Sequence, residues 1–464
     1  MANSDFLQLD AEQAPPRNRT GWLAEQVRDA IMAGTLSPDT RLPASRVLAE
    51  ELSMARGTVV EAYRRLSEEG LLVTNRGGGT SVAELAPVPV PTQPSGPAST
   101  TPPHALDISS GMPDLNAFPR TAWMRAERRV LATATGPELG YTDPQGAPAL
   151  RDALAGWLAR SRGVAVEPSQ IIVTAGVTGG LSLLAQVLRE RGITACAVED
   201  PSAEGTRHVL DYWLDTIVPV RVDEQGLDVA ELARTGARAV LVTPAHQFPT
   251  GVVLSPARRR ELVTWADEVN GLVIEDDYDA EYRYDRAPVR AMQAMAPHRV
   301  IHISSLSKVL APALRIGWMT SPTALHADLV RRRWATDLGS PTLAQLALAE
   351  LIKTGTLERH LRSLRTHHRR RRDAALEALG NYMPGCIVEG IAAGLHLVLR
   401  LPDHIDDTEL ATRAKEAGIA VDTLSQHRSA PGPPGLIIGY GPHPTPQLEQ
   451  AIQTLGALAS LHSS

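Results

Sequence analysis

The sequence has almost no lysine. Among its 46 basic residues only Lys308, Lys353 and Lys415 are lysines, and all the others are arginines. The arginine side chain stays protonated in proteins, whereas a lysine amine can lose its proton and attack a carbonyl carbon to form a Schiff base. Each of the three lysines is therefore a candidate for chemistry that arginine cannot perform.

Cysteine and long apolar runs are also scarce. The two cysteines, Cys196 and Cys386, exclude a scaffold held by several disulfides and fit a reducing compartment. The first residues show no signal-peptide pattern, and no uninterrupted apolar run of about 18 residues occurs. We therefore expect a cytoplasmic protein outside the membrane, and we predict no metal site. The net charge of -6 excludes a globally basic surface, so any DNA binding needs a local arginine face.

A segment rich in proline, serine and threonine divides the chain. The stretch APVPVPTQPSGPASTTPPH, residues 86–104, has neither charged side chains nor apolar periodicity. Such a segment cannot bury a core and behaves as a semi-extended tether. The sequence therefore predicts a small module at residues 17–84, a linker at residues 85–104 and a large module at residues 105–464.

The small module shows three helical patterns and then a glycine-rich ribbon. TGWLAEQVRDAIMAG predicts a helix with Thr20 as its N-cap and Gly34 at its end. RLPASRVLAEELS predicts a second helix that buries Val47, Leu48 and Leu52. ARGTVVEAYRRLSEEG predicts a third helix, and LLVTNRGGGTSVA predicts a two-stranded ribbon. This order of elements is the winged helix-turn-helix layout.

The stretch LPASRVLAEELSMARGTVVEAYRRLSEEGLLVTNRGGGTSVA resembles the GntR-type winged helix, and the similarity covers most of residues 20–83. The resemblance implies contacts to double-stranded DNA from the recognition helix, its neighbour and the wing, through Ser45, Arg46, Arg56, Thr58, Arg76 and Gly77. Residues 17–83 hold nine arginines against eight acids, so the arginines must share one face to bind DNA. Arg64 and Arg65 could serve this face or only solvate a helix, and both interpretations stay open.

From residue 105 on, short apolar runs alternate with amphipathic helical patterns. The runs QIIVTAG, ACAVED, AVLVTP, GLVIEDD and VIHISSL predict strands. This alternation predicts an α/β fold with a mostly parallel sheet, in which ligands bind beyond the carboxyl ends of the strands. The unusual residues of the large module gather at these strand ends.

Three strand ends carry candidate ligand-binding groups. TAGVTGG enters a helix at Val177, Thr178 and Gly179, whose backbone N–H groups would face a bound anion. At a second strand end, Asp276 can hold a pyridinium N–H and Tyr278 can donate to a ring oxygen. The third, SLSKVLAPALR, suits a phosphate-bearing aldehyde: the lysine takes the carbonyl and the other groups bind the phosphate, with Ser305, Ser307, Lys308 and Arg315 as the residues.

Together these segments resemble the fold type I enzymes that depend on pyridoxal 5'-phosphate (PLP), the aminotransferase superfamily. Joined to the winged helix, they resemble the MocR/GabR-type transcriptional regulators. The motifs that carry this resemblance lie at residues 141–164, 246–266, 274–284 and 305–318. It implies a large aminotransferase-like domain with a small C-terminal α+β subdomain and a Schiff base between Lys308 and PLP. It also implies polar groups from His246 and Gln247 near the cofactor ring, and a head-to-tail homodimer.

Two positions depart from the pattern of the superfamily. The family usually has a tyrosine that stacks on the cofactor ring where this chain has Ala203. Aminotransferases usually hold a substrate carboxylate with an arginine where this chain has Ile437, and no arginine occurs in that predicted strand. The sequence therefore favours an effector that needs no such arginine, either PLP itself or an amine or amino acid held differently.

Three functions fit this sequence. The leading hypothesis is a transcriptional regulator that senses a ligand through PLP. The alternatives are a working aminotransferase with an attached DNA-binding module, and a DNA-binding dimer whose large domain has lost the cofactor. Lys308, Asp276 and Arg315 argue against the cofactor-free dimer, and Ile437 argues against the aminotransferase.

Overall fold

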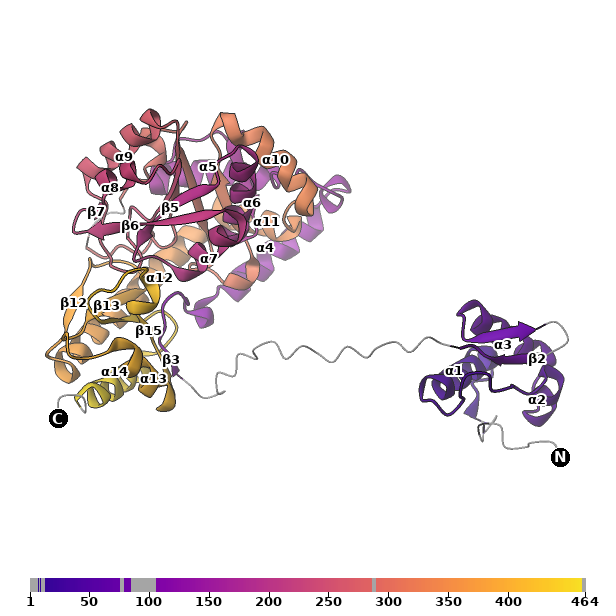
Figure 1. Ribbon diagram of the computed structural model, residues 1–464. Helices are drawn as coiled ribbons and strands as arrows, with labels where there is room; N and C mark the ends of the chain where they lie inside the picture. Colours follow the sequence, from indigo (N-terminus) through magenta and orange to yellow (C-terminus); the bar gives the residue numbers. More distant parts are fainter. Residues whose placement is uncertain are drawn as a thin grey trace. The chain divides into compact units, whose positions relative to one another are not determined.

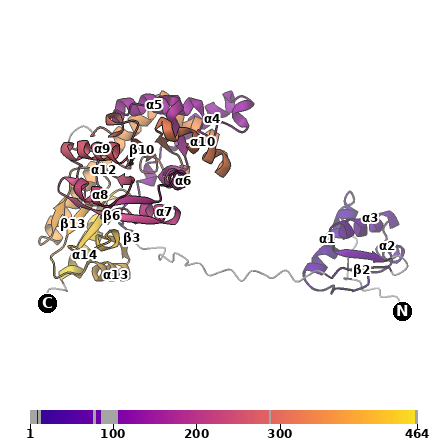
Figure 2. The ribbon, with the colours of Figure 1, turned by 45° about the horizontal axis from the view of Figure 1, so that its top comes forward.

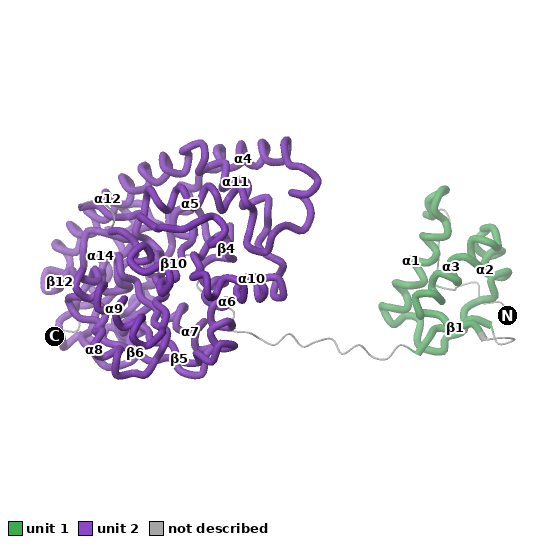
Figure 3. The backbone as a smooth tube through the Cα atoms, turned by 90° about the horizontal axis from the view of Figure 1, so that it is seen from above, with its two compact units in different colours: residues 1–100 green, residues 101–464 purple. Residues whose placement is uncertain are grey.

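The computed structural model describes residues 7, 9, 13–75, 79–84, 106–285 and 289–460. The chain divides into two compact units, residues 1–100 and residues 101–464, which Figure 3 colours green and purple. The predicted linker at residues 85–104 and the predicted wing residues Arg76 and Gly77 lie outside the described residues.

The small unit has the predicted order of a winged helix-turn-helix (Figure 1). Its elements are α1 (Arg19–Met32), α2 (Ser45–Glu51), α3 (Arg56–Glu68), β1 (Leu72–Asn75) and β2 (Gly79–Val82), and the two strands pair antiparallel. Leu23, Leu48, Val59 and Leu66 come from all three helices and are buried in one apolar cluster. This shared core holds α3 in a fixed orientation relative to α1 and α2.

Two local predictions in this unit were wrong. Asn18 rather than Thr20 caps α1, because its side-chain oxygen accepts a hydrogen bond from the N–H of Gly21. Val47 is 42% exposed on the outside of α2, whereas Leu48 and Leu52 are buried as expected. The helix α2 has only seven residues and buries a narrow apolar stripe. The longer predicted helix had a wider buried face that included Val47.

An eight-stranded sheet lies at the centre of the large unit (Figures 1 and 2). Its strands are, in spatial order, β4 (Ile171–Thr174), β11 (Gly317–Thr320), β10 (Val300–Ser305), β9 (Leu272–Asp276), β8 (Ala239–Val242), β5 (Ala195–Asp200), β6 (Thr216–Asp223) and β7 (Gly226–Leu227). From β10 to β6 all neighbours are parallel, and β11 and β7 run antiparallel to theirs. All five predicted strands are present, and the predicted α/β class is confirmed.

Helices cover both faces of this sheet because successive side chains of a strand point to opposite faces. One face, with Val198, Ile274 and Ile301, packs against α6 (Gly176–Glu190), α7 (Glu204–Trp213) and α10 (Thr323–Asp337). The other face packs against α5 (Pro148–Arg162), α8 (Val229–Arg234), α9 (Pro256–Glu268), α11 (Thr342–Lys353) and α12 (Thr356–Tyr382), and α4 (Arg120–Thr133) lies against α11.

A smaller α+β part follows, yellow in Figure 1. Its sheet has the order β12 (Ile387–Glu389), β13 (His396–Arg400), β16 (Gly435–Gly439) and β15 (Asp422–Thr423), and a separate pair joins β3 (Leu106–Asp107) to β14 (Ile419–Ala420). The helices α13 (Asp407–Glu416) and α14 (Thr445–Ser460) share a core with the end of α12. This part matches the predicted C-terminal subdomain. None of the described helices is both long and apolar enough to cross a membrane.

A matched pair of isoleucines tests where the core lies. Ile301 of β10 is fully buried, whereas Ile387 of β12 is 66% exposed. Ile301→Ala should lower the free energy of unfolding of the large unit by about 2–5 kcal/mol because it leaves a cavity, and Ile387→Ala should change it by less than about 0.5 kcal/mol. Urea unfolding followed by tryptophan fluorescence measures both. Equal losses in the two variants would contradict this core.

Candidate functional site

A cavity of about 400 Å³ lies at the carboxyl ends of the parallel strands. Its walls come from the ends of β5, β8, β9 and β10, from the start of α6, and from Leu395 and His396 of the C-terminal subdomain. The remaining wall includes Ser110 and Gly111 from the segment after β3. The cavity therefore touches both the main sheet and the subdomain.

Most of the predicted cofactor residues meet in this cavity. Those that line it are Val177, Thr178, Asp276, Tyr278, Ser305, Ser307, Lys308 and Arg315. Gly179, His246 and Gln247 are not among the lining residues. Gly179 belongs to the first turn of α6, and Gln247 braces a loop by donating from Nε2 to the carbonyls of Pro201 (2.8 Å) and Phe248 (2.6 Å).

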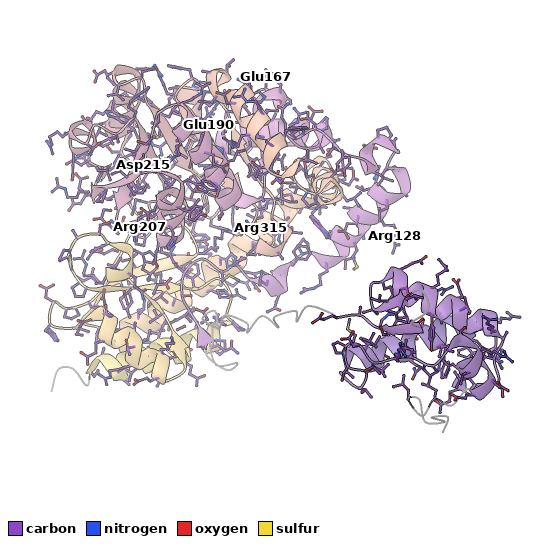
Figure 4. All side chains as sticks on the ribbon, turned by 45° about the vertical axis from the view of Figure 1, so that its right-hand side comes forward. Arg128, Glu167, Glu190, Arg207, Asp215 and Arg315 are labelled. Atoms are coloured by element: carbon purple, nitrogen blue, oxygen red, sulfur yellow. The ribbon has the colours of Figure 1, made fainter. Side chains whose placement is uncertain are left out.

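One corner of the cavity is built to hold an anion. The first N–H groups of α6 have no partner within the helix, and they lie at the positive end of its dipole. Arg315, labelled in Figure 4, is anchored to the same corner because it donates to the carbonyl of Ala175 (2.5 Å). Gly176 and Gly317 permit this approach, since a Cβ at 317 would lie 2.8 Å from the Cα of Gly176. With Ser305 and Ser307, the corner suits a phosphate.

The amine of Lys308 lies inside the cavity, where it donates to the carbonyl of Gly111. Burial lowers the pKa of Lys308, although Asp276 and Asp279 act in the opposite direction. A lowered pKa increases the share of neutral amine, which is the form that attacks a carbonyl carbon. The position and the pKa shift both fit the predicted role of this lysine.

Asp276 is buried beside this lysine and carries an unsatisfied atom. Among the described residues, its Oδ1 has no hydrogen-bond partner. Burial raises the pKa of Asp276 to about 7, and the charge of Asp277 contributes to the rise. A cationic N–H donor in the cavity would supply the missing partner, and a pyridinium ring offers that group. The amine, the carboxylate and the anion corner together fit PLP.

A buried ionic network holds the neighbouring carboxylate, Asp277. Its carboxylate oxygens lie 2.6 and 3.0 Å from the guanidinium of Arg162 and 2.8 Å from Nε2 of His302. Burial acts to raise the pKa of Asp277, but Arg162 and His302 hold it below its usual range. The carbonyl of Asp277 also accepts from the hydroxyl of Ser304 (2.6 Å). This network, which sequence reasoning missed, fixes the end of β9 and thus the direction of Asp276.

Tyr278 faces the cavity and has polar groups behind it. Its hydroxyl oxygen lies 3.1 Å from Nδ1 of His246, and the same nitrogen lies 2.9 Å from Oδ2 of Asp279. Burial, with the nearby Asp279, raises the pKa of Tyr278 well above its usual range. The hydroxyl therefore keeps its hydrogen and can serve as a donor.

Sequence reasoning also missed an aromatic wall of the cavity. Phe248 lines the cavity, and its ring centroid lies 6.0 Å from Tyr278, 5.1 Å from His396 and 5.1 Å from His427. Ala203 lines the cavity without adding a ring. The chain has three phenylalanines, so the one in the motif HQFPTG was a usable signal.

The position expected to hold a substrate carboxylate is apolar. Ile437 is fully buried and packs with Val398 and Leu424. Arg207, labelled in Figure 4, donates to the carbonyls of Gln426 (3.3 Å) and His427 (3.2 Å) and does not line the cavity. Within the described residues, Lys308 and Arg315 are the lysine and arginine side chains that line it. No described group of three or more His, Cys, Asp or Glu side chains could hold a metal ion.

The small unit offers a separate candidate surface for DNA. Arg46 and Arg56 are exposed at the starts of α2 and α3, and Ser45 and Thr58 beside them are partly exposed. Arg64 and Arg65 instead lie 2.7 and 3.1 Å from the carboxylate of Glu61 on their own helix. This pairing favours the interpretation that they solvate the later turns of α3.

Two known families match this chain. Residues 103–455 match "Aminotransferase class I and II", and residues 21–82 match "Bacterial regulatory proteins, gntR family". A relative from Corynebacterium glutamicum, the HTH-type pyridoxine biosynthesis transcriptional regulator PdxR, is 36% identical over 95% of both chains. The probable rhizopine catabolism regulatory protein MocR from Rhizobium meliloti is 32% identical over 99% of this chain and 97% of its own.

Solved structures resemble the large unit. An archaeal alanine:glyoxylate aminotransferase superposes with a TM-score of 0.70 and 26% identity, over 77% of this chain and 91% of its own. The kynurenine aminotransferase of Pyrococcus horikoshii gives a TM-score of 0.71 with 24% identity, over 78% of this chain and 92% of its own. The large unit therefore has the aminotransferase fold.

The raised pKa of Asp276 predicts how stability depends on pH. Between its unfolded value and about 7, this carboxyl binds more protons in the folded chain, so its contribution to stability falls as the pH rises through that interval. The side chain in Asp276→Asn cannot ionise. In the cofactor-free protein, this variant should therefore lose up to about 4 kcal/mol less of its free energy of unfolding between low and high pH than the wild type. Urea unfolding at about pH 4 and about pH 8 measures the effect.

Asp211→Asn is the control for this measurement, because Asp211 is exposed on α7. It should keep the pH dependence of the wild type. If Asp276→Asn kept that dependence as well, Asp276 would not be the strained carboxyl.

Proposed function

The chain belongs to the family of GntR-type transcriptional regulators that carry an aminotransferase class I and II domain, and we propose that its large unit binds PLP and thereby controls DNA binding by its winged helix. The observation that carries the proposal is the cavity in which three groups meet: Lys308, the anion corner around Arg315, and Asp276, whose Oδ1 has no partner among the described residues. Each group matches one part of PLP: the aldehyde, the pyridine nitrogen and the phosphate.

The described residues would divide the work of binding as follows. Lys308 supplies the neutral amine, Asp276 accepts the pyridinium N–H, and Tyr278 donates to the ring oxygen. Ser305, Ser307 and Arg315 would hold the phosphate at the start of α6, together with the N–H groups of Val177, Thr178 and Gly179. PLP, when bound, supplies an aldehyde with which a primary amine can condense.

The effector is PLP itself, or an amine or amino acid held without an arginine–carboxylate pair. The apolar surroundings of Ile437 support this, since a carboxylate would find no bidentate partner there. One relative is named for pyridoxine biosynthesis, which supports PLP as the signal. A working aminotransferase is the second candidate, because the lysine and the anion corner are intact. Conversion of an amino acid to its oxo acid by the purified chain would establish it.

A homodimer is part of the proposal. Side chains on α4, the turn after it, α10 and α11 expose large apolar areas: Met124, Leu131, Leu139, Trp334 and Leu343 are 40–62% exposed. Exposed apolar side chains gathered on neighbouring elements mark an interaction surface. A second copy of the chain, arranged head to tail, is the occupant that the family resemblance implies. A DNA target also supports a location in the cytoplasm.

Lys308→Ala tests the cofactor assignment. The wild type, incubated with PLP and then desalted, should retain the visible absorbance of a lysine-bound cofactor, and Lys308→Ala should lose it because no other amine lines the cavity among the described residues. Lys353→Ala is the matched control, since Lys353 is exposed at the end of α11. An absorbance that survives in Lys308→Ala would overturn the assignment.

Arg56→Ala tests the DNA-binding surface. Loss of one contact from the start of α3 should weaken binding to a promoter fragment selected by the wild type by about tenfold, and should reduce the salt dependence. Arg65→Ala serves as the control, because Arg65 pairs with Glu61 on the same helix. Fluorescence anisotropy at two salt concentrations measures both. An unchanged affinity for Arg56→Ala would show that the recognition surface lies elsewhere.

A further inference from the structure

Three side chains form a hydrogen-bonded series in the wall of the cavity, and its middle member lies behind the other two. Tyr278 and Asp279 both line the cavity, and His246 lies behind them, with Nδ1 3.1 Å from the hydroxyl of Tyr278 and 2.9 Å from Oδ2 of Asp279. His246 and Asp279 are only 4% and 2% exposed. The rings of Tyr278 and His246 are nearly parallel, with an angle of 25° between their planes. His246 therefore meets the cavity contents through Tyr278.

The backbone at Gly394 leaves space for this pair. Its φ is +76°, and a Cβ there would collide with Cε1 of His246 and lie 2.6 Å from Oδ2 of Asp279. The carbonyl of Gly394 accepts from the hydroxyls of Tyr284 (2.8 Å) and Tyr440 (2.6 Å), so this backbone is held in place. The subdomain thus closes over the His246–Asp279 pair without separating it.

The contacts determine where the hydrogens lie. An ionised Asp279 can only accept, so it selects the form of His246 with hydrogen on Nδ1. A nitrogen that carries hydrogen cannot accept from the hydroxyl of Tyr278, so the tyrosyl oxygen, 3.1 Å away, shares this N–H with Asp279, which is nearer at 2.9 Å. The tyrosyl hydrogen then points either to Asp279, which is also within its reach, or to an oxygen atom in the cavity.

Other charged and titratable groups surround this series. Asp276, Glu199 and Lys308 line the cavity beside Tyr278. The ring of His396 lies 5.3 Å from that of His246 on the subdomain side, and burial with the nearby His246 lowers the pKa of His396 to about 4. These groups stay in place in the variants below, so they do not account for differences between them.

We propose that His246, oriented by Asp279, is a positioning residue that acts through Tyr278, by holding its hydroxyl as a hydrogen-bond donor to an oxygen atom of the cavity ligand. The inference rests on the proposed function, in which that atom is the ring oxygen of PLP. A donated hydrogen bond stabilises the ionised form of this oxygen. The pair thereby lowers the pH at which the bound cofactor changes its visible absorbance.

The experiment is a pH titration of the absorbance of the full chain loaded with PLP. In His246→Gln the transition should move to higher pH, by about one unit or less, because the hydrogen bond that holds the tyrosyl hydroxyl is weakened. Tyr278→Phe should move it in the same direction and at least as far. His298→Gln is the matched control, since His298 makes the same kind of pair with Asp267 (3.0 Å) on the surface.

The double variant Tyr278→Phe/His246→Gln separates positioning from direct action. If His246 acts through Tyr278, the double variant should titrate like Tyr278→Phe alone. A further shift in the double variant, or no shift in His246→Gln, would overturn the inference. Gly394→Ala offers an independent route, because its Cβ displaces the pair while both side chains remain, and it should shift the transition upward as well.

Folding and cofactor binding are followed in the same samples. Circular dichroism identifies a variant that fails to fold, and the remaining variants then decide the question. A wild type that retains no visible absorbance would overturn the proposed function and this inference with it. A wild type that binds PLP, with variants that titrate as it does, would overturn this inference alone.

Discussion

The structure of the site depends on the cost of burying the carboxylate of Asp276, whose Oδ1 has no hydrogen-bond partner in the described part of the chain. The carboxyl lies at the end of a central parallel strand, and its pKa is raised because it has been removed from water. The charges of Lys308 and His302 offset this strain only in part. Arg162 and His302 form their hydrogen bonds with the next residue, Asp277. The unsatisfied oxygen therefore remains available to a cationic group that enters the cavity.

Close backbone contacts bring the other groups to the same place. Gly176 and Gly317 touch, so the strand that follows Arg315 lies against the start of α6, and the guanidinium joins the free N–H groups there. Gly394 lets the subdomain approach His246 and Asp279 in a similar way. In both places the absence of a side chain allows two distant segments to form one wall of the cavity. The geometry of the site therefore depends on these glycines as well as on its polar residues.

The sequence predicted the strand ends but not the support behind them. Strand periodicity and the motif around Lys308 placed Asp276, Tyr278 and Arg315 correctly in one cavity, because parallel strands expose their carboxyl ends at one edge. The partners of Asp277 could not be predicted, since Arg162 and His302 come from segments more than a hundred residues apart. The sequence also did not show that His246 lies behind Tyr278 and does not line the cavity. Motif spacing gives the distance between residues along the chain, and it does not show which side chain faces the cavity. The limits of the linker and the wing remain predictions.

The cavity also lies where a ligand can influence the arrangement of the large unit. Its walls belong to the main sheet and to the C-terminal subdomain, and hydrogen bonds join the two beside it. The N–H of Ser202 donates to the carbonyl of His427 (3.0 Å), and Nδ1 of His427 lies 3.2 Å from the carbonyl of Ser202. Phe248 packs on His427 from inside the cavity. Suppose that the sheet and the subdomain can adopt two relative arrangements. A ligand shifts the balance between these arrangements only if it binds them with different free energies. Phe248 lines the cavity and packs on His427, so it is one of the described residues whose contacts would have to differ between two such arrangements.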